Sequence, residues 1–239
     1  MPRLQSFLSR HGHASRRAAA ELILEGRVTV NNETIREPGH RVNPATDAIT
    51  LNGIPVAGAP PCHATVMLNK PAGYVCSADR TQGRSVCDLV AGAGTRLVPV
   101  GRLDKDSDGL LLLSNDGDLI LKLTHPRYGH TKTYRVMVDG AINAAVLKSL
   151  RSPITIDAKP TRPAHVEHTA PNELLFTLGE GRNHQIRRLC ERANLRVERL
   201  TRVSINTLRL PEELPVGHWR KLTDEEISAT LRSSSTPRA

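Results

Sequence analysis

The stretch GRLDKDSDGLLLLSNDG, residues 101–117, joins a polar turn to the most apolar short run in its neighbourhood. Three aspartates and a glycine precede four consecutive leucines, which is typical of a turn that leads into a buried strand. We therefore expect a strand over residues 110–114. Asp104, at the start of the turn, is the strongest candidate in the chain for a reactive carboxylate.

The alternating aspartates of this turn, followed by Gly109, also match the opening of a calcium-binding EF-hand loop. Such a loop needs an oxygen ligand near its ninth position and a glutamate at its twelfth. Leu112 and Asn115 stand at those positions. We therefore expect no calcium site, and we interpret Asp106 and Asp108 as ordinary residues of a solvated turn.

Two further segments carry chemical groups in a regular pattern. In KTYRVMV, residues 132–138, the alternation predicts a strand with Tyr134, Val136 and Val138 on one face. GEGRNHQIRRLC, residues 179–190, is a glycine-bracketed loop that runs into a basic helix.

In their order and spacing, these three segments resemble the core motifs of the bacterial RsuA-type pseudouridine synthases, which modify uridines in ribosomal RNA. LNKPAGYVCS, residues 68–77, resembles the strand and loop that open the catalytic domain of that family. GHWRKLT, residues 217–223, resembles its closing segment, and the resemblance covers residues 1 to about 227. Two positions depart from the pattern: Ser107 stands where threonine is commoner, and His184 where arginine is common.

The resemblance implies an isomerisation of uridine to pseudouridine without a cofactor. It assigns Asp104 as the nucleophile, or as the base that starts glycal formation, and both routes remain open. An ionised carboxylate in a water-poor pocket needs a cation or several donors beside it. The resemblance gives this part to Arg187, whose guanidinium can hold a carboxylate with two parallel hydrogen bonds. Tyr134 matches the tyrosine that stacks on the flipped-out uracil.

Several polar residues around these motifs are candidates for binding RNA. Arg102 and Lys105 flank Asp104 and could bind phosphates next to the target nucleotide, or they could be ordinary surface charges. The basic helix and its preceding loop offer four more candidates: Asn183, His184, Gln185 and Arg188.

The composition is compatible with an RNA partner. The net charge of +9 and the pI near 9.9 produce a positive field that attracts polyanions. Residues 179–202 contain seven arginines and three glutamates, an excess that favours phosphate contact. Aromatic residues make up only 3% of the chain, which excludes a broad base-stacking platform. Recognition is therefore expected to depend on shape, phosphates and one flipped base.

The cysteine and histidine patterns indicate neither a metal site nor a disulfide framework. The four cysteines form no CxxC pair and have no ligand-like histidine spacing. His11 and His13 straddle a glycine in a predicted turn without a third ligand nearby, and we interpret them as loop residues. The chain begins without the apolar stretch of a signal peptide and contains no segment of membrane-spanning length. We expect a soluble, cytoplasmic protein with no metal, no small-molecule cofactor and no membrane partner.

The first 56 residues predict a small module of two helices and three strands. The helices are expected over residues 4–11 and from an N-cap at Ser15 to residue 25, with Gly26 ending the second in left-handed geometry. Strands follow at residues 28–30, 34–36 and 48–51. This order resembles the S-four RNA-binding module first seen in a ribosomal protein, in which Arg16, Arg17 and Arg27 would contact phosphates. A small helical cap with ordinary surface arginines is the alternative.

The rest of the chain predicts a linker at residues 57–63, a catalytic domain at residues 64–231 and a disordered tail at residues 232–239. Strands are expected at residues 64–68, 98–103, 110–114, 133–139, 164–168, 174–178, 197–203 and 207–210. Helices are expected at residues 118–124, 143–150, 183–193 and 224–231. This series does not alternate strand and helix, so it predicts an α+β fold with a mixed, mainly antiparallel sheet.

Two functions from different classes remain open. The first is a ribosomal RNA uridine isomerase that works on an assembling particle, where an exposed target is cheaper to flip. The second is a catalytically silent RNA-binding assembly factor of the same fold. A carboxylate among RNA phosphates lowers affinity by like-charge repulsion, and this favours the enzyme. The motif sequences around Asp104 and Arg187 resemble those of large-subunit relatives slightly more closely. No heptad seam or dimer strip is present, so we expect a monomer.

Overall fold

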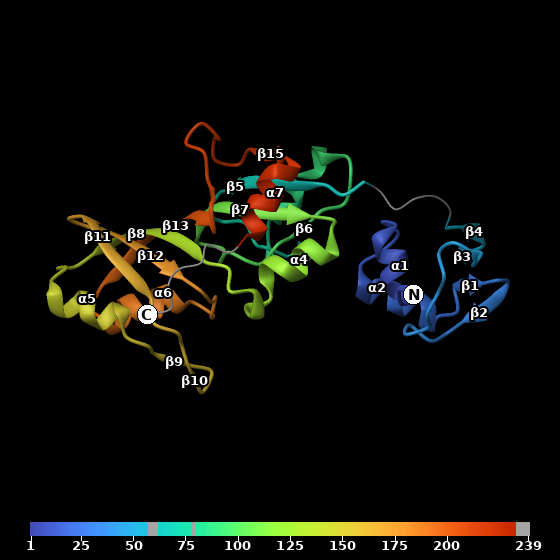
Figure 1. Ribbon diagram of the computed structural model, residues 1–239, viewed down its shortest axis with the longest axis horizontal. Helices are drawn as coiled ribbons and strands as arrows, with labels where there is room; N and C mark the ends of the chain where they lie inside the picture. Colours follow the sequence, from blue (N-terminus) through green and yellow to red (C-terminus); the bar gives the residue numbers. More distant parts are fainter. Residues whose placement is uncertain (57–61, 78–79, 233–239) are drawn as a thin grey trace. The chain divides into compact units, whose positions relative to one another are not determined.

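The structure, a computed structural model, describes residues 1–56, 62–77 and 80–232 (Figure 1). The described residues form two units, one consisting mainly of residues 1–63 and the other of most of the chain from residue 64 onward. Most of the predicted linker and the predicted tail beyond residue 232 lie outside the described residues.

The N-terminal unit packs two helices against a small sheet. Helices α1 (Leu4–Arg10) and α2 (Arg16–Leu24) precede an antiparallel sheet with the order β2-β1-β3-β4. Ser15 caps α2 by accepting a hydrogen bond of 3.1 Å from the Ala18 amide, and Gly26 takes a φ of 75° after the helix. The predicted caps and helices are confirmed. The strands are β1 (Val28–Val30), β2 (Glu33–Ile35), β3 (Ile49–Leu51) and β4 (Ile54–Pro55).

A large mixed sheet forms the centre of the second unit. Its strand order within the described residues is β11-β12-β8-β13-β7-β5-β15, with β6 paired to β7 and β14 paired to β13. Only the β13–β7 pair is parallel among these described strands, so the predicted α+β fold with a mainly antiparallel sheet is confirmed. The strands are β5 (Thr65–Lys70), β6 (Val98–Pro99), β7 (Asp108–Ser114), β8 (Lys132–Asp139), β11 (His165–Ala170), β12 (Glu173–Leu178), β13 (Arg196–Ile205), β14 (Leu208–Arg209) and β15 (Trp219–Lys221).

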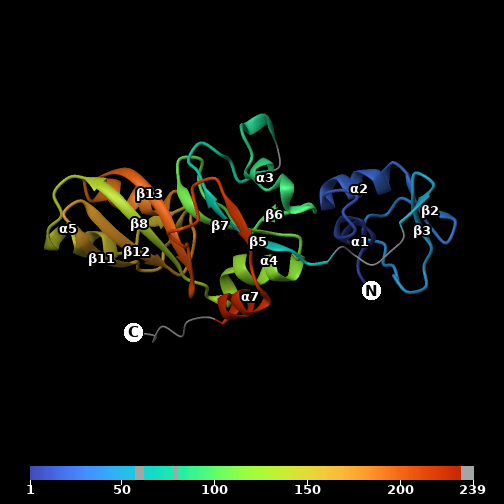
Figure 2. The same ribbon diagram turned by 90° about the horizontal axis from the view of Figure 1, so that it is seen from above.

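The run of leucines in β7 is buried because both faces of the sheet are covered there. Leu110 and Leu112 pack in one cluster with residues of α4 (Gly117–Thr124) and α7 (Asp224–Leu231). Leu111 and Leu113 belong to the cluster on the other face, which includes residues of α3 (Val86–Leu89). Helices α4 and α7 lie beside β5 and β7 in both views (Figures 1 and 2). A strand with two covered faces needs a continuous apolar run rather than alternation.

Strand β8 has only one covered face, and its sequence alternates accordingly. Tyr134, Val136 and Val138 are buried, whereas Arg135 on the opposite face is exposed. Helices α5 (Ala144–Arg151) and α6 (Gln185–Arg192) contribute to the cluster on the buried face. The predicted common face of these three residues is confirmed.

Several predicted elements differ from the structure. The strand expected at residues 98–103 ends at Pro99, because the chain then enters the turn that carries Asp104. The helix expected from residue 183 starts at Gln185, since His184 has a φ of 52° and cannot continue a right-handed helix. Several short elements were not predicted, among them α3, β4, β15, β9 (Thr155–Ile156) and β10 (Lys159–Pro160).

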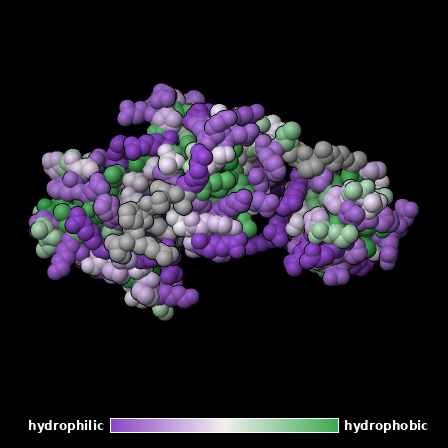
Figure 3. Space-filling model, viewed as in Figure 1, coloured by the Kyte–Doolittle hydropathy of each residue, from purple (hydrophilic) through white to green (hydrophobic). Residues whose placement is uncertain are grey.

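Hydrophilic side chains cover most of the face shown in Figure 3, and hydrophobic residues form smaller patches between them. No helix within the described ranges has the length and apolar character needed to cross a membrane. Groups of three or more histidine, cysteine or acidic side chains able to hold a metal ion are absent from these same ranges.

Candidate active site

The turn that carries Asp104 is held through its backbone carbonyl groups by a buried lysine. Lys70, the last residue of β5, is fully buried, and its Nζ donates to the carbonyl oxygens of Ser107 at 2.6 Å, Asp104 at 3.2 Å and Lys105 at 3.3 Å. A fourth contact, at 3.1 Å, goes to its neighbour Pro71. Burial lowers the pKa of Lys70, while nearby aspartates act in the opposite direction. The converging carbonyl groups accept the hydrogen bonds that the Lys70 ammonium group would otherwise donate to water.

A buried arginine supports the same segment from the other side. Arg202 of β13 is 1% exposed, and its Nε donates to the Leu110 carbonyl at 2.7 Å. Its Nη1 lies 3.4 Å from the Arg102 carbonyl. Gly109 has a φ of 99°, and a Cβ atom there would lie 2.4 Å from the backbone oxygen of Arg202. Only glycine allows β7 and β13 to approach so closely at this point.

A pocket of about 260 Å³ opens beside Asp104. It brings together seven of the residues that the sequence analysis selected: Arg102, Asp104, Tyr134, Asn183, His184, Gln185 and Arg187. The lining also includes Leu103, Ser107, Leu178, Gly181, Arg182, Ile186 and Leu200. Lys105 and Arg188, which were also selected, are not part of this lining. The pocket is therefore formed mainly by the Asp104 turn, by the loop that precedes α6 and by the first residues of α6, with one residue each from β8, β12 and β13.

The ion pair predicted between Asp104 and Arg187 is not formed in the structure. The Asp104 carboxylate, whose side chain is 38% exposed, lies 3.8 Å from Nε2 of His184. Arg187 points to the same turn, but its Nη2 donates to the carbonyl oxygen of Asp106 at 3.4 Å. The left-handed backbone of His184 turns its ring toward the pocket before α6 begins. Among the described residues, His184 rather than Arg187 thus pairs with the candidate reactive carboxylate.

Comparisons with known proteins show the family to which the chain belongs. Residues 64–192 match the family model described as RNA pseudouridylate synthase, and residues 2–56 match the S4 domain. The chain belongs to the RNA pseudouridylate synthase family. This synthase is therefore an isomerase that acts on RNA.

Relatives match the synthase over nearly its whole length. An RNA pseudouridine synthase of Aquifex aeolicus is 38% identical over 97% of this chain and 94% of its own length. Ribosomal large subunit pseudouridine synthase B of Bacillus subtilis is 37% identical over 95% of this chain and 94% of its own. The dual-specificity RNA pseudouridine synthase RluF of Escherichia coli is 35% identical over 94% and 77%, respectively. A crystal structure of a pseudouridylate synthase, 28% identical, aligns with a TM-score of 0.69 over 96% of this chain and all of the other.

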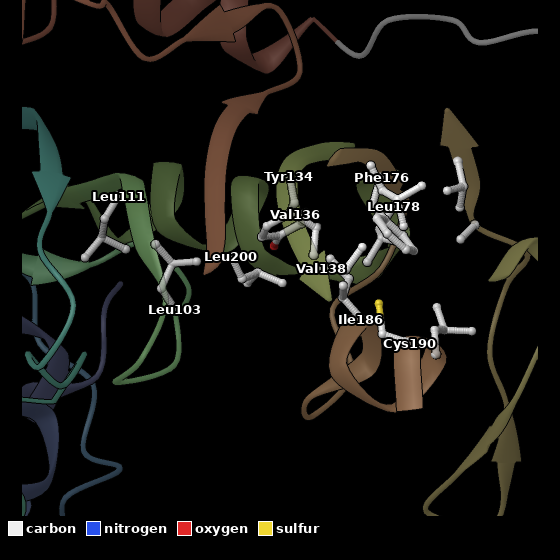
Figure 4. Packing of buried hydrophobic residues seen from close by; sticks show 14 of the residues in the cluster. Leu103, Leu111, Tyr134, Val136, Val138, Phe176, Leu178, Ile186, Cys190 and Leu200 are labelled. Atoms are coloured by element: carbon white, nitrogen blue, oxygen red, sulfur yellow. The ribbon is translucent and has the colours of Figure 1, made fainter. Parts of the chain in front are cut away.

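Tyr134 lies where the synthase core meets the pocket. Its residue is 8% exposed, and β8 pairs it with Phe176 on one side and Arg202 on the other. Figure 4 shows its side chain near Val136 and Leu200, with Leu103 also in the cluster. Most of the ring is therefore fixed by packing, and the part that lines the pocket has a defined orientation.

Asp108 requires a correction. The sequence analysis interpreted Asp106 and Asp108 as solvated turn residues, but the Asp108 side chain is only 13% exposed and its Oδ2 lies 2.8 Å from Nε of Arg199. It begins β7, beside the parallel strand β13 that carries the arginine. Asp108 thus links two strands, and Asp106 remains exposed.

In the S4 domain, Arg16 and Arg17 are exposed at the first turn of α2. Arg27 is exposed as well, but its Nε donates to Oδ1 of Asn52 at 2.7 Å and its Nη1 lies 3.4 Å from Glu25. The first two arginines present their charge at the surface, whereas the third also stabilises the turn between α2 and β1.

Sequence reasoning missed Lys70 and Arg202, which support the active-site turn. A signal was present for the first, because TVMLNK ends an apolar strand with a lysine that the sheet buries. The sequence gives little sign that Arg202 is buried, because it is one of seven arginines in residues 179–202. Only the strand register distinguishes it from the exposed Arg199.

Proposed function

We propose that this synthase converts uridine to pseudouridine in ribosomal RNA and that Asp104 carries the chemistry. The observation that supports this proposal is the position of a partly exposed carboxylate in a pocket that also contains a packed tyrosine and several nitrogen donors. A single reactive carboxylate matches a reaction that consumes no second substrate.

The proposed reaction balances within one nucleotide. The bond from ribose C1′ to uracil N1 breaks, the base rotates, and a new bond forms between C1′ and C5. The C5 proton is lost to solvent and N1 gains a proton, so no oxidant or reductant is required. Asp104 would either attack C1′ or remove a sugar proton to start a glycal route.

His184 and Arg187 would position the Asp104 carboxylate during this reaction. His184 is already 3.8 Å away. The Arg187 hydrogen bond to the Asp106 carbonyl is long at 3.4 Å and would be exchanged for a stronger, charge-assisted bond to Asp104. We propose that this exchange accompanies RNA binding.

Tyr134 would stack on the flipped uracil. A tyrosine that is fixed by packing loses little side-chain entropy when a base stacks on it, and its ring offers a flat apolar face. Flipping is cheapest for a base that is unpaired or in a partly assembled particle.

Ribosomal RNA, and the large-subunit RNA in particular, is the proposed substrate because the Bacillus subtilis relative is named for that subunit. The S4 domain would add affinity by contacting phosphates through Arg16, Arg17 and Arg27. Arg102, Lys105, Asn183, Gln185 and Arg188 are the proposed RNA contacts of the catalytic unit. These contacts would position the RNA without reading its bases.

Tritium release tests the proposal directly. Large-subunit and small-subunit rRNA transcripts with tritium at C5 of uridine are incubated with wild type and with Asp104→Asn. We expect release from the large-subunit transcript with wild type only. Release by the variant at the wild-type rate would remove Asp104 from the reaction, and release from the small-subunit transcript alone would contradict the proposed substrate. If RNA is bound but neither transcript nor assembly intermediates release tritium, the protein is a silent assembly factor.

A further inference from the structure

A second cavity, of about 280 Å³, adjoins the Asp104 pocket. It lies between the end of α4, the start of β8 and the turn at residues 179–181. Arg102, Tyr134 and Gly181 line both cavities, so the two share a wall. Lys132 and Arg202 line only the second one.

The sheet places two cations next to Tyr134 on one face. Lys132 and Tyr134 are alternate residues of β8, so their side chains project to the same side. Arg202 of β13 is directly opposite Tyr134 in the antiparallel register, and opposite residues also share a face. The tyrosine that borders the Asp104 pocket therefore has a lysine and an arginine as its neighbours.

Neither cation has an acidic partner among the described residues. Nη2 of Arg202 is buried without any hydrogen-bond partner in the part of the chain that the structure describes. Lys132 forms no side-chain hydrogen bond or ion pair with another described residue. Burial, together with repulsion from Arg202, lowers the pKa of Lys132 to about 8. Buried charges are normally paired, so this arrangement destabilises the isolated protein.

The one carboxylate in the cavity lining is engaged elsewhere. Oε1 of Glu180 accepts a hydrogen bond of 2.5 Å from the Arg162 amide, and its Oε2 lies 3.7 Å from Nε of Arg182. The His130 ring, also in the lining, has its Nδ1 2.6 Å from Nδ2 of Asn206, and burial lowers its pKa. The counter-charge for Lys132 and Arg202 is thus not supplied by these groups.

We propose that this cavity binds a phosphate group of the RNA strand whose target uridine enters the Asp104 pocket. A phosphate accepts hydrogen bonds from both a guanidinium and an ammonium group, and its negative charge would balance the positive charges of Lys132 and Arg202. Free phosphate has the same chemistry, but the wall shared with the Asp104 pocket favours a phosphate that belongs to the substrate. The proposal rests on the proposed function, because it names a backbone contact of that same substrate.

The salt dependence of RNA binding tests the contact. Binding of a large-subunit rRNA fragment is measured over a range of salt concentrations for wild type and Lys132→Met, with Lys148→Met as the matched control. Lys148 is exposed on α5 and lines neither cavity. We expect Lys132→Met to raise the Kd about tenfold and to reduce the slope of log K against log salt by roughly one. An unchanged slope for Lys132→Met, or an equal change in both variants, would overturn the proposal.

A neutral linkage identifies the source of the phosphate. Single methylphosphonate linkages are placed at successive positions around the uridine found by tritium release. We expect one position to weaken binding by wild type and to have no further effect on Lys132→Met. Inorganic phosphate is titrated in parallel. Inorganic phosphate could bind wild type but not Lys132→Met, while every methylphosphonate position affects both proteins equally. In that case the site binds free phosphate and the assignment to an RNA phosphate is wrong.

Stability distinguishes a binding role from a structural one. Removing an unpaired, partly buried charge should leave the urea midpoint of Lys132→Met at or above that of wild type in the absence of RNA. A lower midpoint would show that Lys132 holds the fold. The two proposals can be refuted independently. Tritium release together with an unchanged salt slope for Lys132→Met refutes only the phosphate site. A reduced salt slope without tritium release refutes only the isomerase.

Discussion

Replacing Lys70 by methionine tests whether the Asp104 turn is positioned through its carbonyl groups. Methionine fills a similar volume in the sheet but cannot donate to the carbonyl oxygens of Asp104, Lys105 and Ser107. These groups would then be buried or partly buried with a missing donor. We expect the turn to shift and Asp104 to leave its position.

The size of the effect follows from the number of contacts. A hydrogen bond to a charged group contributes about 1.5–3 kcal/mol, and Lys70 makes three to this turn in addition to the one with Pro71. Removing the charge also removes the burial cost that lowers the pKa of Lys70, which offsets part of the loss. We expect the free energy of unfolding to fall by about 3 kcal/mol, and turnover by at least ~10²-fold, since a displacement near 1 Å has this effect on a reacting group.

Urea unfolding and single-turnover tritium release measure the two consequences. Lys105→Met is the control for stability, because Lys105 is an exposed lysine of the same turn and its loss should change the free energy of unfolding by less than about 0.5 kcal/mol. Turnover is measured at a temperature and protein concentration at which unfolding curves show Lys70→Met to be folded. If the folded variant turns over at the wild-type rate, the carbonyl contacts do not position Asp104 and the reasoning fails.

Four further predictions concern single residues. Asp104→Asn should lower turnover by at least about 10³-fold while RNA affinity, measured by filter binding, is unchanged or improved, because a like charge near phosphates is removed. Arg187→Lys keeps the charge but loses the planar guanidinium, so we expect about a 10²-fold loss in single-turnover rate, and a rate near wild type would show that the proposed exchange to Asp104 is not needed. The pKa of Lys132 is lowered from 10.5 to about 8, so between these pH values only the unfolded chain keeps the Lys132 proton. The free energy of unfolding of wild type relative to Lys132→Met should therefore rise from pH 8 to 10, by at most about 1.4 kcal/mol per pH unit. A difference that does not change with pH would contradict the lowered pKa. Gly109→Ala should destabilise the protein by about 3 kcal/mol or more in urea unfolding, because its Cβ would lie 2.4 Å from the Arg202 oxygen, whereas Gly73→Ala, with a φ of 90° and no atom within 4 Å, should cost only about 1 kcal/mol.

The elements that the sequence predicts well are those whose pattern reports burial directly. The alternation of Tyr134, Val136 and Val138 identifies a strand with one covered face, and the leucine run of β7 identifies one with two. Caps such as Ser15 are equally local, because a hydroxyl bonds an amide three residues away. The strand expected to reach residue 103 stops at Pro99, since the pattern there does not show where pairing with β7 ends.

The site was predictable as a set of residues but not as a set of contacts. Motif resemblance selected seven residues that line one pocket. It did not predict that His184 would lie beside Asp104, because this depends on a left-handed φ that the sequence signals only weakly. Lys70 and Arg202 were missed because their partners are backbone carbonyl groups, and carbonyl groups carry no residue identity that a motif could reveal.

The carbonyl contacts also bear on how a basic protein keeps the carboxylate of Asp104, the proposed reactive residue, available to a substrate. Lys70, Arg202 and Arg187 all donate hydrogen bonds to main-chain oxygens of the segment from residue 102 to residue 110. Had they paired with the carboxylate instead, the site would have formed a closed ion pair that RNA must first break. The main chain therefore accepts the hydrogen bonds of these three cations. Among the described residues, the Asp104 side chain has one longer contact, at 3.8 Å to His184. Because the backbone of the turn is held by hydrogen bonds and the Asp104 side chain is not, the carboxylate can interact with a substrate while the turn keeps its position.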